Sequence, residues 1–141
     1  MPGRKKNAKE RMESMNYGFS KTTQLSFDDA LHKAAQELQK ESFGVITTID
    51  IQKTMKNKLN VDFQKYIILG VCNPPLAYRA LQTEEEIGLL LPCNVIVYEK
   101  GNNVVVAAFN PQVMTLVMEN PEMNSIAQEV KARLERVIAA I

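Results

Sequence analysis

The sequence predicts an α+β fold, in which a mainly antiparallel, curved sheet carries its helices on one face. Five short segments are rich in β-branched and apolar residues, as strands are. Two of these segments are joined by the turn Lys100-Gly101-Asn102-Asn103, which is typical of a hairpin. Two longer segments, 26–41 and 121–141, repeat apolar residues at helical spacing. Hairpin-linked strands run antiparallel, so we expect a mainly antiparallel sheet. The predicted order of elements is β-α-β4-α, with short helical inserts.

The predicted strands follow from alternation and from the breakers between them. Pro92 interrupts the fourth strand and indicates an edge or a bulge at that point. The predicted strands cover residues 17–25, 45–51, 63–71, 89–99 and 104–109.

The predicted helices have recognisable ends. Ser26 can cap the first helix. Asn60 can close a short helix over residues 51–59 in the left-handed conformation. Asn73 can cap the helix after the third strand, with Pro74 at its first position. A short helix after Asn110-Pro111 and a long one after Pro121 complete the chain.

Composition bounds the class of protein. The 141 residues suit one domain, and 45% of them are apolar, which is enough to form a core. Residues 1–15 are basic and almost free of large apolar side chains, so we expect a mobile tail ahead of a single domain over residues 16–141.

Charge and hydropathy exclude several partners. Seventeen basic and sixteen acidic side chains leave a net charge of +1, which argues against a nucleic-acid surface. No apolar run is long enough to cross a membrane, and the N-terminus lacks the apolar core of a secretory signal. We therefore expect a cytoplasmic protein with no nucleic-acid or membrane partner, in which the two cysteines are thiols.

The last two strands are apolar on both faces. Helices can cover only one of these faces, so the second must meet a ligand, a curled part of the same sheet or another subunit. The two alternating sets in the fifth strand are Val104, Val106 and Ala108, and Val105, Ala107 and Phe109.

Six short motifs resemble one known family. They are YGFSK (17–21), FGV (43–45), ID (49–50), KLNVDF (58–63), LGVCNP (69–74) and GLLLPCNV (88–95). In this order they resemble a family of small bacterial and archaeal proteins known only as domain of unknown function 302. The resemblance covers about residues 17–141. It implies a β-α-β4-α fold like one repeat of the TATA-binding protein, and a homodimer. Asn60 departs from the glycine usual in the family, which affects only a turn.

The candidate site lies at two repeated dipeptides, Cys72-Asn73 and Cys93-Asn94. Cys72 precedes a predicted helix N-terminus, whose N–H groups favour a thiolate. We expect a non-enzymatic dimeric domain that binds a small molecule or a soft metal near these four residues. Two cysteines alone fall short of a four-ligand metal site.

Two alternatives remain open for this site. In one, Cys72 and Cys93 cycle between dithiol and disulfide, although their spacing gives none of the support of a Cys-x-x-Cys motif. In the other, the protein is structural and both cysteines only pack. The sequence identifies no catalytic residue and no cofactor, since it has no paired histidine base and no Gly-rich phosphate loop.

Overall fold

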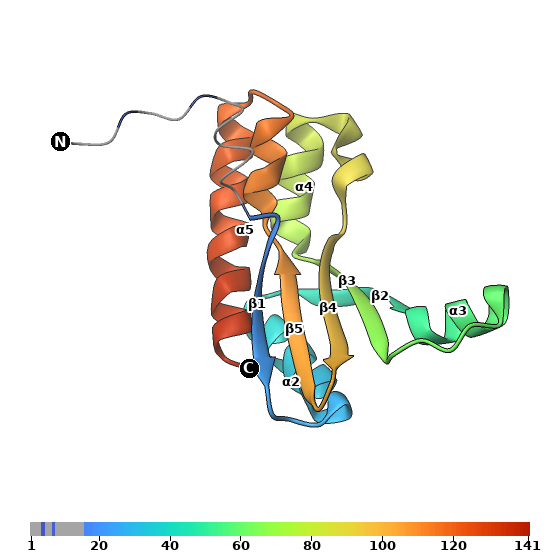
Figure 1. Cartoon of the computed structure of the whole chain (residues 1–141). Coiled ribbons are helices and arrows are strands. Elements are labelled where there is room, and N and C mark those ends of the chain that lie inside the picture. Colours follow the sequence, from blue (N-terminus) through green and yellow to red (C-terminus); the bar gives the residue numbers. More distant parts are fainter. Residues whose placement is uncertain (1–3, 5–6, 8–15) are drawn as a thin grey trace.

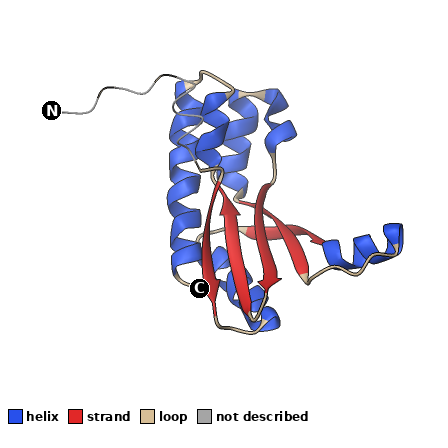
Figure 2. Ribbon diagram, in the orientation of Figure 1, coloured by secondary structure: helices blue, strands red, loops and turns tan. Residues whose placement is uncertain are grey.

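A single antiparallel sheet organises the computed structural model, which describes residues 4, 7 and 16–141. Its five strands lie in the order β1-β5-β4-β3-β2, and helices cover one face (Figures 1 and 2). The strands are β1 (Gly18–Thr23), β2 (Gly44–Asp50), β3 (Tyr66–Cys72), β4 (Cys93–Lys100) and β5 (Asn103–Phe109). The helices are α2 (Phe27–Lys40), α3 (Ile51–Leu59), α4 (Pro74–Thr83) and α5 (Pro121–Ala139), with 3-10 turns η1 (Glu85–Leu90) and η2 (Pro111–Leu116).

The α+β class and the β-α-β4-α order are confirmed, and so are the predicted helix ends. Ser26 Oγ accepts a hydrogen bond from the Asp29 N–H at 3.1 Å. Asn60 ends α3 in the left-handed conformation with φ of 53°. The mobile tail predicted for residues 1–15 falls, except for residues 4 and 7, outside the described residues. None of the described helices is long and apolar enough to span a membrane.

The predicted fourth strand was wrong at its start. Leu89 and Leu90 lie in η1, and the strand begins only at Cys93. Proline has no N–H to donate to a sheet, so the ladder starts after Pro92, which is preceded by a cis peptide bond. The third strand begins at Tyr66, three residues later than predicted.

The core lies between the sheet and helices α2, α4 and α5 (Figure 1). Alternate residues of the central strands enter it, among them Val95 and Val97 of β4 and Val106 of β5, all fully buried. Leu38 of α2 and Leu134 of α5 meet them from the helical layer and are also fully buried. One face of the sheet is therefore covered within the chain.

The segment over residues 44–65, here called the arm, stands away from this core. It consists of β2, α3 and the return to β3, and every residue of β2 is exposed. Figure 1 shows α3 at the far right, at a distance from the other helices. β2 is an edge strand that pairs only with β3. Within the arm, β2 is therefore fixed to β3 along its length, whereas α3 contacts mainly β3 among the described elements.

Candidate functional site

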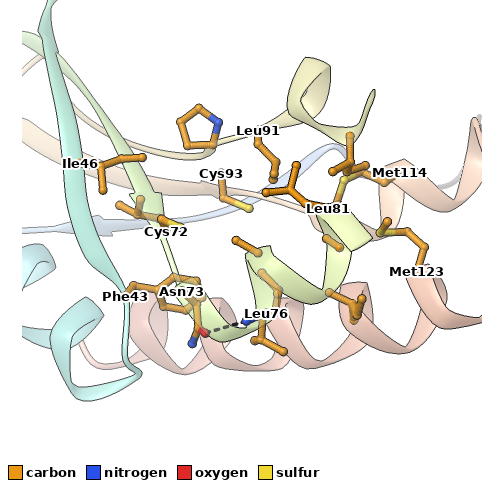
Figure 3. A pocket seen from close by; sticks show the side chains of 17 residues that line it. Phe43, Ile46, Cys72, Asn73, Leu76, Leu81, Leu91, Cys93, Met114 and Met123 are labelled. Atoms are coloured by element: carbon orange, nitrogen blue, oxygen red, sulfur yellow. Dashed lines mark hydrogen bonds between the residues drawn. The ribbon is translucent and has the colours of Figure 1, made fainter. Parts of the chain in front are cut away.

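An apolar cavity of about 280 Å³ lies where β3 ends and β4 begins (Figure 3). α5 supplies its buried floor through Met123, Ile126 and Val130. α4 supplies a side wall through Leu76 and Ala80, which are also buried. The helical layer therefore separates slightly from the sheet at this end and leaves a concave, hydrophobic site.

The opening of the pocket is formed by exposed apolar side chains. Ile46 of β2 is 63% exposed and Leu81 of α4 is 42% exposed, although both line the cavity. Ile46 lies at the irregularity in the β2–β3 register between Val45 and Thr47. A β-bulge re-aims a side chain in this way, and Figure 3 shows Ile46 directed from β2 toward the cavity.

Both cysteines line this cavity, and neither forms a disulfide. Cys93 is directly opposite Val71 in the β3–β4 register, whereas Cys72 is the last residue of β3. The side chains of Cys72 and Cys93 lie on the same side of the pocket in Figure 3. The structure therefore brings together two thiols that are 21 positions apart in the chain.

The two thiols differ in their environment. Cys93 is 7% exposed, and burial raises its pKa to about 11, with a further rise from negative charge on Cys72. Because the thiolate is the reactive form, Cys93 is a neutral, unreactive thiol near pH 7. Cys72 is half-buried, so a reagent in the pocket meets its sulfur more readily.

The two asparagines are not equivalent either. The Asn73 side chain is buried and its amide is already engaged: Oδ1 accepts from the Leu76 N–H at 3.3 Å, and Nδ2 donates to the Glu41 carbonyl at 3.5 Å. Asn73 therefore caps α4 and shapes the pocket wall. Asn94 is exposed, pairs with Gly70 and does not line the cavity. Alternation along β4 directs it away from Cys93.

The donor set does not fit a metal held by one chain. Among the described residues, no group of three or more His, Cys, Asp or Glu side chains is placed to hold an ion. The pocket contributes the thiols of Cys72 and Cys93 and the thioethers of Met114 and Met123, and the carboxylates lie elsewhere. A structural zinc site takes four ligands, so the pocket as built favours an apolar molecule over a soft metal.

Sequence reasoning missed most of the pocket lining. Met114 of η2 and Met123 of α5 lie more than twenty residues beyond both cysteines, and Phe43 lies about thirty residues before Cys72. The helical periodicity of α5 marked its apolar stripe as buried. Periodicity gives no indication of which buried side chains border an empty space.

Comparisons with known proteins identify the family and the fold. The family model described as domain of unknown function DUF302 matches residues 19–141. A crystal structure of an uncharacterized conserved protein DUF302 from Bacillus stearothermophilus is similar, with a TM-score of 0.82 and 24% identity over 88% of this chain and 97% of that one. No curated protein matches the sequence.

Proposed function

Because the chain belongs to the family described as domain of unknown function DUF302, which prescribes no reaction, we propose from the pocket itself that the protein is a non-enzymatic binding module for a small apolar molecule. The apolar cavity carries this proposal. Its polar groups are the two thiols and an amide that the protein itself satisfies. Ligand sites are typically concave and mostly apolar, with few polar groups to orient the ligand.

The size of the cavity limits the ligand. A cavity of about 150 Å³ lined by apolar side chains holds benzene, so about 280 Å³ suits a molecule of roughly ten non-hydrogen atoms. A single fused ring system or a short, branched acyl chain has this size. At ordinary ligand efficiencies such a molecule binds in the micromolar to millimolar range.

Thiol redox chemistry is the second candidate, because Cys72 and Cys93 line the same cavity. The raised pKa of Cys93, about 11, opposes it, since dithiol exchange needs an accessible thiolate. We also propose a cytoplasmic location, where thiols stay reduced.

The proposed homodimer is a separate part of this function. It is supported by apolar side chains that the chain leaves uncovered, among them Ile46, Ile49 and Leu59. Most closed assemblies of one chain are twofold dimers. Light scattering that returned only the monomer mass at micromolar concentration would contradict it.

Binding can be tested with indole and 1-hexanol as probes, followed by protein NMR. We expect saturable shifts of the amide signals around Leu76, Cys93 and Met123, which line the pocket. Ala77→Leu should abolish them, because Ala77 lines the cavity and a larger side chain fills it.

Ala132→Leu is the matched control for this variant, since Ala132 lies exposed on α5 and does not line the cavity. It should bind both probes like the wild type. Absence of saturable shifts in the wild type, or equal binding by Ala77→Leu, overturns the pocket as the site. A Cys72–Cys93 disulfide that forms reversibly with glutathione would favour the redox alternative.

A further inference from the structure

Four of the side chains that line the pocket carry sulfur, and they come from four different elements. Cys72 and Cys93 end β3 and begin β4, whereas Met114 lies in η2 and Met123 in α5. Figure 3 shows the two thiols toward one end of the cavity and the two thioethers toward the other. Both methionines are buried, so their sulfur atoms belong to the interior. A molecule in the cavity therefore has sulfur on two sides.

The rest of the lining offers a ligand almost nothing to hydrogen-bond. Among the described lining residues, Asn73 is the only one whose side chain carries nitrogen or oxygen, and its Oδ1 already caps α4. A hydroxyl, amide or charged group buried there would lose its water without gaining a partner. The buried part of the ligand is therefore a hydrocarbon. Any polar substituent stays at the opening, beside the exposed side chains of Ile46 and Leu81.

One aromatic side chain completes the lining at the thiol end. Phe43 directly precedes Gly44, which pairs with Cys72 across β2 and β3. It is buried, and among the described lining residues it is the only aromatic one. Aromatic rings in proteins prefer offset or edge-to-face contacts with one another, and such contacts add to the gain from area burial. Phe43 therefore favours a second ring as its neighbour in the cavity.

A fused ring system and a short, branched acyl chain both fit the cavity by size, but the sulfur atoms distinguish them. Thioether sulfur makes favourable contacts with aromatic rings, often at the ring edge, and gains nothing comparable from an aliphatic chain. We propose that the ligand carries an aromatic ring, which lies between the thiols and the thioethers of the pocket with its polar substituent at the opening. This inference rests on the proposed binding function and narrows its class of ligand.

A purely structural role for the two methionines leads to a different expectation. Methionine is flexible and fills irregular gaps in a core, whatever molecule lies beside it. Leucine has nearly the same volume and lacks sulfur, so it replaces methionine in such a role at little cost. Substitution by leucine therefore separates the contribution of sulfur from that of volume.

The first experiment compares 2-phenylethanol with 2-cyclohexylethanol by NMR titration of the full chain. The two probes have the same number of non-hydrogen atoms and the same hydroxyl group, and they differ only in the ring. Apolar burial alone predicts that the cyclohexyl compound binds at least as tightly, because its ring is the larger hydrocarbon surface. We expect 2-phenylethanol to bind about threefold tighter or better, because contacts with sulfur and with Phe43 favour its ring.

The two ways of failing are distinct. If neither probe gives saturable shifts, the proposed binding function fails and the ligand class fails with it. If both bind and the cyclohexyl compound binds equally well or better, the pocket stands as a binding site and the aromatic ligand alone is overturned.

Leucine variants test the sulfur atoms themselves. Met114→Leu and Met123→Leu should each weaken binding of 2-phenylethanol about twofold or more and leave 2-cyclohexylethanol unchanged, since only the aromatic ring loses a contact. Met118→Leu is the matched control, because Met118 packs against the core without lining this cavity, and it should bind both probes like the wild type. An aromatic preference that persists in the double variant Met114→Leu/Met123→Leu would contradict the role of the thioethers.

Discussion

The two faces of the sheet have nearly the same composition and different surroundings. On β5, Val106 points into the core and is fully buried, while its neighbour Val105 is 6% exposed yet lies outside the core cluster. On β4, Val97 is likewise fully buried in the core cluster, whereas its neighbour Tyr98 lies outside it. Apolar side chains on both faces mean that both need a cover. The chain provides α2 and α5 for one face, and in the proposed homodimer a second copy would cover the other.

The pocket lies where these two environments meet. Cys93 pairs with Val71 of the core, so its side chain lies on the helix-covered face of the sheet, where it is buried. Cys72 ends β3 with the alternate register and is half-buried. Ile46, which belongs to the arm's own strand, forms part of the mouth.

The largest expected difference between the two environments concerns matched leucines. Leu134 is fully buried on α5, so Leu134→Ala should lower the free energy of unfolding by about 2–5 kcal/mol. Leu59→Ala in the arm should cost less than about 0.5 kcal/mol at protein concentrations where the monomer dominates. Urea denaturation measures both. Similar losses would show that the arm is packed within its own chain.

The adjacent valines of β5 sharpen the comparison within one strand. Val106→Ala should cost about 2 kcal/mol, from two buried carbons and the cavity they leave. Val105→Ala should cost about 1 kcal/mol at protein concentrations where the monomer dominates, because half-exposed neighbours such as Tyr98 can relax into the gap. Equal costs for the two variants would argue that both sides of β5 are packed equally tightly.

The two thiols should also differ in how fast they are alkylated. Cys93→Ser, which retains Cys72, should react with iodoacetamide at least tenfold faster than Cys72→Ser at neutral pH, a difference of about 1.4 kcal/mol in activation free energy. The reason is that burial excludes the reagent from Cys93 and raises its pKa to about 11. The rate of Cys93 should keep rising up to that pH. The reverse order of rates would place Cys93 at the accessible side of the pocket.

The smallest expected effect is a pH dependence on the covered side. Arg136 donates to the Glu41 carboxylate at 2.8 Å, and this hydrogen bond holds the pKa of Glu41 below its ordinary value. A lowered folded pKa stabilises the protein above the unfolded value, and the stabilisation is lost as the pH falls through the folded pKa. Melting temperatures of the wild type should therefore decline more steeply than those of Glu41→Gln as the pH falls below 4.5. Parallel curves would show that the pair contributes nothing.

The sequence by itself determined the class, the element order and most helix ends. These are local properties: Ser26 and Asn73 carry capping side chains, Asn60 tolerates positive φ, and strand alternation is visible in the residue types. It also pointed to Cys72 and Cys93, because each lies three residues after a leucine and directly before an asparagine. A ligand role for them, for Asn73 and for Asn94 stays a prediction.

Only the tertiary structure decided which apolar residues are covered and where a cavity remains. Val105 and Val106 are indistinguishable in the sequence, because coverage depends on helices more than sixty residues before β5 and more than ten after it. The pocket depends on how far α5 lies from the ends of β3 and β4, a distance set by packing of the whole helical layer. Local sequence patterns determine whether a segment forms a helix or a strand. Long-range packing determines which of its side chains are buried.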